Sequence, residues 1–500
     1  MDEPAAKRPR TPTSKGPERR VSRRTVVLAA GAAAGGLAVS RVLGLHPIVP
    51  DPFALLDRSA APLVNTKDWV SPLDRPEAQV AQLLRRATFG MTKAQYESAV
   101  TDGFAKTVDR LVETPAALPK DLAGADLATQ DKPVNVTALQ SWWLDQMLSS
   151  ATPFAERMTY FWHGHFTSDF RKVSAQTPYI YWQNLTWRKM ALGAFRDMLQ
   201  QVTVDPGMLR YLDLGQSTGK APNENYAREL MELFTMGVGT FTEDDVRAGA
   251  KALAGWREPL TQAMVEYQIA RARQQGRTPA RNLVADSVRT GVFEPARAYK
   301  GSVTYLGVTK QWDTNAVLDR IMQQDSVGPY VAGKLIREFV MPDPPDAYVA
   351  RIAAGWKRSG YDVKTLMRDI FRSPEFLQPV AYRSLVKSPT EVMVHLARAL
   401  EAPQLSRTIA QSGGSMGQAL FDPPEVGGWP TNASWVSSNN VLTRVNFVVT
   451  TLGGIQKLPA FDNAHQTHID GIVSEQTAQL LNSATDDQTR WLILLASPEF

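Results

Sequence analysis

Residues 223–256 carry the clearest helical pattern in the chain, and this pattern leaves little freedom in how the stretch can fold. The apolar residues Tyr226, Leu230, Leu233 and Phe234 recur at intervals of three and four, so they fall on one side of a helix. The opposite side holds charged and amide side chains: Glu224, Asn225, Arg228, Glu229 and Glu232. We therefore expect an amphipathic helix with one face in a hydrophobic core.

A glycine turn and a second helix follow this first helix. Gly237 and Gly239 suit the left-handed backbone positions that end helices. Thr242 and Asp245, three residues apart, have the spacing of a capping box, in which each side chain bonds the main chain of the other residue. The sequence therefore predicts a second helix that begins directly after Thr242.

The polar face of the first helix has two interpretations. In one, Glu224, Arg228 and Glu232, spaced four residues apart, form a solvated ladder of ion pairs that contributes a few tenths of a kcal/mol per pair. In the other, Asn225, Glu229 and Glu232 line a polar cleft in which carboxylates bind a metal ion or move protons. Periodicity does not choose between the two.

Helical patterns with start and stop signals recur from residue 77 to residue 500, and no linker composition interrupts them. Residues 261–282, rich in Arg and Gln, predict an exposed helix, and the alternation in 292–306 predicts a hairpin. We therefore predict a mainly α fold, a large multi-helix single body over residues 77–500 with at most a small β-hairpin.

The segment His163-Gly164-His165 follows a predicted helix over residues 154–162. Residues two apart do not share a helical face, but Gly164 can end the helix, so that both imidazoles converge from a loop. Imidazole is a common metal ligand, and two histidines would be half of a site completed by carboxylates. A polar catalytic cleft without metal and purely structural histidines are the alternatives.

Together these two motifs define the candidate site. The predicted ligands of a divalent metal ion are His163, His165 and Glu232. The predicted catalytic residues are Glu229, Arg228 and Asn225, with Arg228 orienting an anionic group.

Residues 421–435 form the most rigid predicted loop, because they contain two glycines, three prolines and two tryptophans. Either a tryptophan packs as a structural plug, which we favour, or the aromatic rings form one wall of a ligand site.

Charge and composition exclude several classes of function. The formal net charge is +5, and residues 1–40 hold the whole excess, with eight Lys or Arg against three Asp or Glu. The neutral remainder argues against a nucleic-acid partner, since such binding depends on clustered positive charge. The chain has no cysteine, which excludes disulfides, thiol nucleophiles and thiolate metal sites. Walker, GxGxxG and HExxH motifs are also absent.

Residues 1–40 are similar to a twin-arginine export signal. A long basic segment precedes Arg23-Arg24, and a weakly hydrophobic run that is too short to span a membrane follows. Residues 38–40 offer a cleavage site, and a signal that is not cleaved would act as an anchor. The alternative to an export signal is a basic tail in which the double arginine occurs by chance. We predict export through the twin-arginine translocase to an extracytoplasmic location, with an extended arm over residues 41–76.

Several stretches taken together resemble the family named Domain of Unknown Function 1800. They occur in the order of the family and cover the chain from about residue 77 to its end: LLRRATFG (83–90), FWHGHFTS (161–168), DPGMLRYLD (205–213), NENYARELMELFTMGVG (223–239) and VGGWPTNASW (426–435). The resemblance implies a large, mainly helical bacterial protein that is exported. Such proteins are often encoded beside proteins that resemble sulfatases and alkaline phosphatases, which implies a co-exported partner of that kind. The resemblance implies no known reaction.

The chain departs from the family pattern at one place. Where members tend to carry a His-Asp pair and a Lys, this sequence has Ala298, Tyr299 and Val303. If the missing pair binds metal or catalyses, this chain has an altered or lost activity.

Two hypotheses for function follow. The first is an exported enzyme with a His/carboxylate cleft that performs metal-assisted hydrolysis or oxidation of an envelope substrate. The second is a non-catalytic binding or assembly partner of a co-exported hydrolase, in which the polar residues hold helices together.

Overall fold

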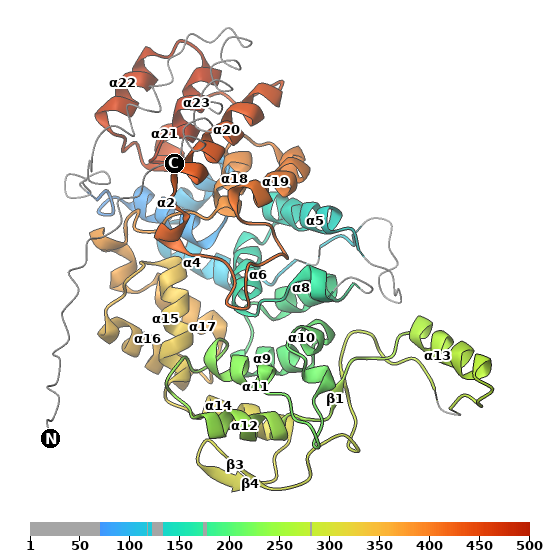
Figure 1. Ribbon diagram of the computed structural model, residues 1–500. Helices are drawn as coiled ribbons and strands as arrows, with labels where there is room; N and C mark the ends of the chain where they lie inside the picture. The colour runs from blue at the N-terminus through green and yellow to red at the C-terminus, as the bar shows by residue number, and fades with distance from the viewer. Residues whose placement is uncertain (1–70, 118, 123–133, 174–177, 281–282) are drawn as a thin grey trace, which may run out of the picture. The chain divides into compact units, whose positions relative to one another are not determined.

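The structure, a computed structural model, describes residues 71–117, 119–122, 134–173, 178–280 and 283–500 (Figure 1). The chain divides into two units, Met1–Trp69 and Val70–Phe500. The first unit lies outside the described residues, and so do the predicted export signal and most of the predicted arm. The second unit contains all of the helices and strands below.

The second unit is mainly helical, as predicted. Its α-helices before the first strand are α2 (Pro76–Ala87), α3 (Lys93–Asp102), α4 (Phe104–Glu113), α5 (Val136–Ser149), α6 (Pro153–His165), α7 (Phe170–Val173), α8 (Tyr179–Met190), α9 (Phe195–Val204), α10 (Pro206–Tyr211), α11 (Asn225–Glu232) and α12 (Glu243–Ala252). Those after it are α13 (Gln262–Gln274), α14 (Thr314–Met322), α15 (Val327–Phe339), α16 (Asp346–Arg358), α17 (Val363–Phe371), α18 (Pro389–Ala399), α19 (Ser406–Gly413), α20 (Ser438–Gly454), α21 (Ala464–Ile469), α22 (Glu475–Ser483) and α23 (Asp487–Ala496). In this part of the chain, every helix is too short or too polar to cross a membrane.

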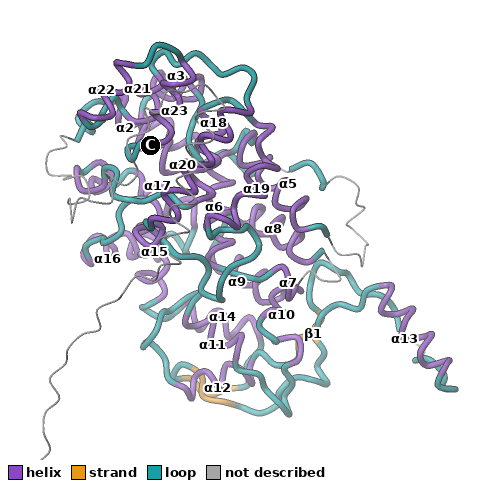
Figure 2. Tube along the Cα trace, turned by 45° about the horizontal axis from the view of Figure 1, so that its top comes forward, coloured by secondary structure: helices purple, strands orange, loops and turns teal. Residues whose placement is uncertain are grey.

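The strands form two small antiparallel sheets, which Figure 2 shows in orange beside the helices. β1 (Trp256–Arg257) pairs with β2 (Val292–Phe293), and β3 (Val303–Tyr305) pairs with β4 (Val308–Lys310). The hairpin predicted over 292–306 is therefore misplaced. Leu306 and Gly307 have positive φ angles of 45° and 81°, so they make the two-residue turn of a hairpin that extends to Lys310.

The predicted helix pair is confirmed in α11 and α12. α11 buries Tyr226 and Leu230, and Gly237 and Gly239 have φ angles of 83° and 80°. Thr242 and Asp245 form the predicted capping box at the start of α12. The second carboxylate oxygen of Asp245 accepts the main-chain N–H of Leu306 at 2.8 Å, which ties the β3–β4 hairpin to this helix.

The exposed helix predicted within 261–282 is confirmed as α13, which stands apart from the other helices in both views (Figures 1 and 2). Val265 is its one buried side chain.

The buried apolar side chains form two hydrophobic cores. The first gathers side chains from α2, α4, α9, α11, α12 and α14 to α17, and the second from α5, α8, α18, α20 and α23. α6 contributes to both, with Met158 and Trp162 in the first core and Tyr160 in the second. Polar side chains of α6 therefore lie close to the boundary of two apolar regions.

A buried carboxylate fixes the start of α10. Asp205 is 6 % exposed, and its Oδ1 accepts the N–H of Met208 at 2.8 Å and Nε2 of Gln183 at 2.9 Å. Burial raises the pKa of Asp205 from 3.8 to about 7, against the opposing effect of these hydrogen bonds.

Replacing Asp205 by Asn tests this electrostatic strain. Because the folded-state pKa is raised, the folded protein binds the proton more tightly, so stability is lost as the pH rises from about 4 to about 7. Asn keeps the cap but has no charge to bury. In chemical unfolding, the unfolding free energy of Asp205→Asn relative to that of the wild type should rise by roughly 1 kcal/mol per pH unit across this window. A constant difference between the two proteins would contradict the assignment.

Candidate functional site

The two histidines lie inside a helix, not in a loop. α6 continues to His165, and the N–H of Phe166 still bonds the carbonyl of Trp162 at 2.8 Å, so the predicted helix end at residue 162 is wrong. One glycine costs about 1 kcal/mol in a helix interior. Packing on both sides of Gly164 offsets this cost, because both imidazoles are buried.

His163 faces the second core and the 421–435 loop. Its ring centroid lies 5.0 Å from those of Trp143 and Phe421 and 5.2 Å from that of Trp429. Its Nε2 accepts the main-chain N–H of Phe421 at 3.2 Å. Burial lowers its pKa to about 3, so the ring is neutral.

His165 faces the first core. Its Nε2 lies 3.0 Å from the carbonyl oxygen of Phe234, so Nε2 carries the hydrogen. Its buried Nδ1 is then an acceptor that has no hydrogen-bond partner. Burial, and next the positive charge of Lys334, hold the pKa of His165 well below its usual value.

We call the polar contact between two helices the α6–α15 seam: Arg157 and His165 of α6 with Tyr330, Lys334 and Glu338 of α15. Arg157 donates to Glu338 at 2.7 Å. His165 lies two turns after Arg157 on α6, and Lys334, whose positive charge lowers the pKa of His165, lies one turn before Glu338 on α15. The two helices thus face each other in antiparallel order. Tyr330 donates to the carbonyl of Leu233 at 3.0 Å, which joins the seam to the end of α11.

Lys334 differs from the other charged groups of the seam in its lack of a partner among the described residues. It is half-buried, its Nζ lies 5.6 Å from the ring centroid of Tyr330, and no described residue gives it a hydrogen bond or an ion pair. Burial lowers its pKa from 10.5 to about 8; Arg337 acts in the same direction and Glu338 against it. A considerable fraction of this amine is therefore neutral near pH 7 to 8.

The predicted catalytic residues of α11 are divided between two places. Arg228 donates to both oxygens of Glu243 at 2.6 and 2.7 Å and to Glu224 at 3.3 Å. The Glu224–Arg228 pair of the predicted ladder is therefore present, and Glu243 takes the place of Glu232 as the second partner. Asn225 donates to Asp213 at 3.3 Å. These side chains bind neighbouring loops and helices, away from the seam.

Glu229 and Glu232 lie on the side of α11 that faces other titratable groups. Glu229 is half-buried, and burial, followed by the charge of Glu232, raises its pKa. Glu232 in turn helps to raise the pKa of Tyr330, after the larger effect of burial. Glu229 and Glu232 are therefore neighbouring carboxylates that act on each other, while a cleft lined by Asn225, Glu229 and Glu232 stays a prediction.

The structure does not gather the predicted metal ligands into one set. His163 and His165 have different aromatic surroundings, and Glu232 belongs to the surroundings of Tyr330. Within the described ranges, no group of three or more His, Cys, Asp or Glu side chains is placed to hold a metal ion. A metal site of His163, His165 and Glu232 stays a prediction without geometric support from these residues.

Sequence reasoning did not select the residues that complete the seam. Tyr330, Lys334 and Glu338 are spaced four apart on α15, and Arg157 and His165 are eight apart on α6. Such spacing marks one face of each helix. That the faces meet is visible only from the fold.

The 421–435 loop packs as a plug over the end of α6, as we favoured from its sequence. Gly428 has a φ of 94°, and a Cβ built there would lie 2.7 Å from the carbonyl oxygen of Gly164. This close approach sets Trp429 against His163. Ala298 and Tyr299 lie elsewhere, beside Gly219 and Gly255.

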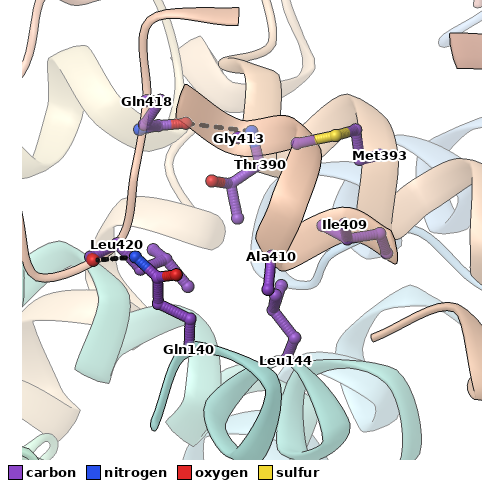
Figure 3. Close-up of a pocket in the computed structure, with 9 residues that line it drawn as sticks. All are labelled: Gln140, Leu144, Thr390, Met393, Ile409, Ala410, Gly413, Gln418 and Leu420. Carbon is purple, nitrogen blue, oxygen red and sulfur yellow. Dashed lines mark hydrogen bonds between the residues drawn. The ribbon is translucent and has the colours of Figure 1, made fainter. Parts of the chain in front are cut away.

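A separate small pocket, with room for about one water molecule, lies between α5, α18 and α19 (Figure 3). In Figure 3 the hydroxyl of Thr390 and the amides of Gln140 and Gln418 stand among apolar side chains, and Gln418 accepts the N–H of Thr390 at 2.9 Å. None of the predicted site residues lines this cavity.

Gly428→Ala should displace the loop. The substitution adds a clash with main-chain atoms at a backbone angle that L-residues avoid, so we expect unfolding free energy to fall by at least about 1 kcal/mol. Gly427→Ala is the matched control, because its Cβ would meet only Glu425 Oε1 at 3.5 Å. Equal stabilities of the two variants in urea unfolding would show that the plug does not depend on this contact.

Residues 82–500 match the family model described as Protein of unknown function (DUF1800). No curated protein and no solved structure matches the chain.

Proposed function

Because the chain belongs to the DUF1800 family, whose description assigns no reaction, we propose its function from the α6–α15 seam. The proposal is an enzyme that works by proton transfer, with the amine of Lys334 as the general base. The single observation that carries it is a half-buried amine to which no described residue gives a hydrogen bond or an ion pair, whose positive charge acts on the buried imidazole of His165 and whose own pKa is lowered by burial to about 8.

Each neighbour of Lys334 has a part in this chemistry. The neutral His165 keeps an apolar wall next to the amine, and its Nδ1 is free to accept a hydrogen bond. Tyr330 can donate a hydrogen bond to substrate only by releasing the carbonyl of Leu233. Glu229, whose pKa is raised, and Glu232 supply carboxylates on α11 for a polar or cationic part of the substrate. The reaction class is proton abstraction or hydrolysis by an activated water.

Location and partner are part of the proposal. The basic segment with Arg23-Arg24 supports export through the twin-arginine translocase, which would place the enzyme outside the cytoplasm with an envelope substrate. A co-exported sulfatase- or phosphatase-like protein is the proposed partner. The second candidate, a non-catalytic partner of such a hydrolase, is favoured by the sequence, which has Ala298 and Tyr299 where the family resemblance implies a His-Asp pair.

Lys334→Met tests the enzyme proposal. The wild type and the variant are incubated with an envelope extract of the organism that makes the protein, and new products are measured by mass spectrometry. Loss of a general base should slow product formation by roughly 100-fold or more.

Lys357→Met is the matched control for this experiment, because Lys357 is exposed and pairs only with Asp325 at 2.9 Å. It should keep wild-type rates. If the wild type makes no product, or if Lys334→Met makes the same products at the same rate, the amine is not the base and the non-catalytic role is favoured.

A further inference from the structure

Residues 258–291 connect β1 with β2 and contain α13, and we call them the α13 insert. Its two ends are held together beyond the β1–β2 pair, because Leu260 and Asp286 exchange two hydrogen bonds of 2.8 Å. Arg257 also donates to Asp286 at 2.7 Å. The base of the insert is therefore fixed, and α13 begins directly beyond it, where the side chain of Thr261 caps the helix.

α13 buries little of its own surface. Of its 13 residues, Val265 alone has a buried side chain, and the helix stands apart from the other helices in both views (Figures 1 and 2). A helix of about 12 to 15 residues is only marginally stable without packing. Most sides of α13 are therefore open to contact with something outside the described chain.

The α13 insert carries positive charge without counter-charge. Residues 261–285 contain four arginines and one acidic residue, Glu266, although residues 41–500 are neutral as a whole. Arg271, Arg273 and Arg277 are exposed, and no described residue gives their side chains a hydrogen bond or an ion pair. The insert is therefore a local concentration of accessible guanidinium groups, which complements an anionic surface.

The arrangement of these arginines favours one kind of anionic surface. Arg271 and Arg273 are two residues apart, so they point to different sides of α13, and Arg277 follows the end of the helix. A groove on an acidic protein would contact one side of the helix and leave the other charges unpaired. A layer of anionic lipid headgroups surrounds a helix end that enters it, so it neutralises charges on every side.

α13 also exposes side chains that suit the headgroup region of a bilayer. Met264 and Tyr267 are three residues apart, so they lie on the same side of the helix, and Tyr267 is 65 % exposed. Tyrosine is enriched where membrane and water meet, because its ring is apolar and its hydroxyl is polar. Arginine has a similar division between an aliphatic stem and a charged end.

We propose that the α13 insert binds the surface of an anionic lipid bilayer. Arg271, Arg273 and Arg277 lie among the phosphate groups, and Tyr267 lies at the boundary between headgroups and acyl chains. The contact is peripheral, and it does not depend on the reaction proposed for Lys334.

Single-cysteine reporters test this contact directly, because the chain has no cysteine of its own. Gln274→Cys, at the exposed end of α13, is labelled with the polarity-sensitive fluorophore NBD. Val238→Cys is the matched reporter, since Val238 is 79 % exposed on the turn between α11 and α12. Vesicles of phosphatidylglycerol and phosphatidylcholine in equal parts should raise the emission at position 274 about twofold or more and leave position 238 unchanged. Vesicles of phosphatidylcholine alone should change neither.

Two triple variants with the same change of net charge test the arginines in the Gln274→Cys background. Arg271→Gln with Arg273→Gln and Arg277→Gln should raise the vesicle concentration for half-maximal emission at least about tenfold. The control combines Lys220→Gln, Arg407→Gln and Lys457→Gln, which are exposed residues elsewhere on the described chain, and should bind as the parent does. Far-ultraviolet circular dichroism checks that both variants are folded.

Several results would overturn the proposal. The reporter at position 274 would not respond to the anionic vesicles, which would leave an acidic protein as the occupant of the insert, or it would respond equally to phosphatidylcholine alone. Equal responses at positions 274 and 238, or equal losses in the two triple variants, would show contact without a role for α13. Sedimentation with the vesicles without a response at position 274 would place the contact elsewhere in the chain, as in the basic residues 1–40.

Discussion

The ion pairs of Arg157 hold the structure together at the boundary between its two hydrophobic cores. This side chain is 3 % exposed and lies between Glu338 of α15 and Glu391 of α18. Although burial acts to lower it, the two carboxylates raise the pKa of Arg157 above its usual value. Its guanidinium also lies 5.1 to 5.6 Å from the ring centroids of Phe89, Tyr160 and Phe339, which come from both cores. Breaking a buried pair by removing one partner typically costs 3 to 5 kcal/mol.

The proposed site follows from this arrangement. On one side of Arg157, its pairing with Glu338 sets α6 against α15, and the same two helix faces carry His165 and Lys334. On the other side, Glu391, the second partner of Arg157, caps the start of α18 with Ser388, so one guanidinium is tied to both helices.

Local features of the fold could be predicted from the sequence, because they depend on neighbours in the chain. The capping box of Thr242 with Asp245 and the glycine turn are of this kind, and so is the membership of Asp205 in a helix start. The end of α6 could not be predicted, since the preference of Gly164 for a helix end is small against the packing of His163 and His165 into separate cores. The partners of Arg157, Glu338 and Glu391, lie 181 and 234 positions further along the chain, and no sequence periodicity reveals contacts over such separations.

The candidate site divides in the same way. Glu229 and Glu232 were recognisable as a polar helical face, whereas Lys334 gains its chemistry from burial against α6, which only the fold shows. The most direct measurement is therefore the pKa of Lys334, by NMR of the protein with ¹³C-methylated lysines and with Lys334→Met to assign the signal. Titration with a midpoint near 8 is expected from burial of the amine. A midpoint near 10.5, the ordinary value of a lysine, would show a solvated amine and contradict the proposed base.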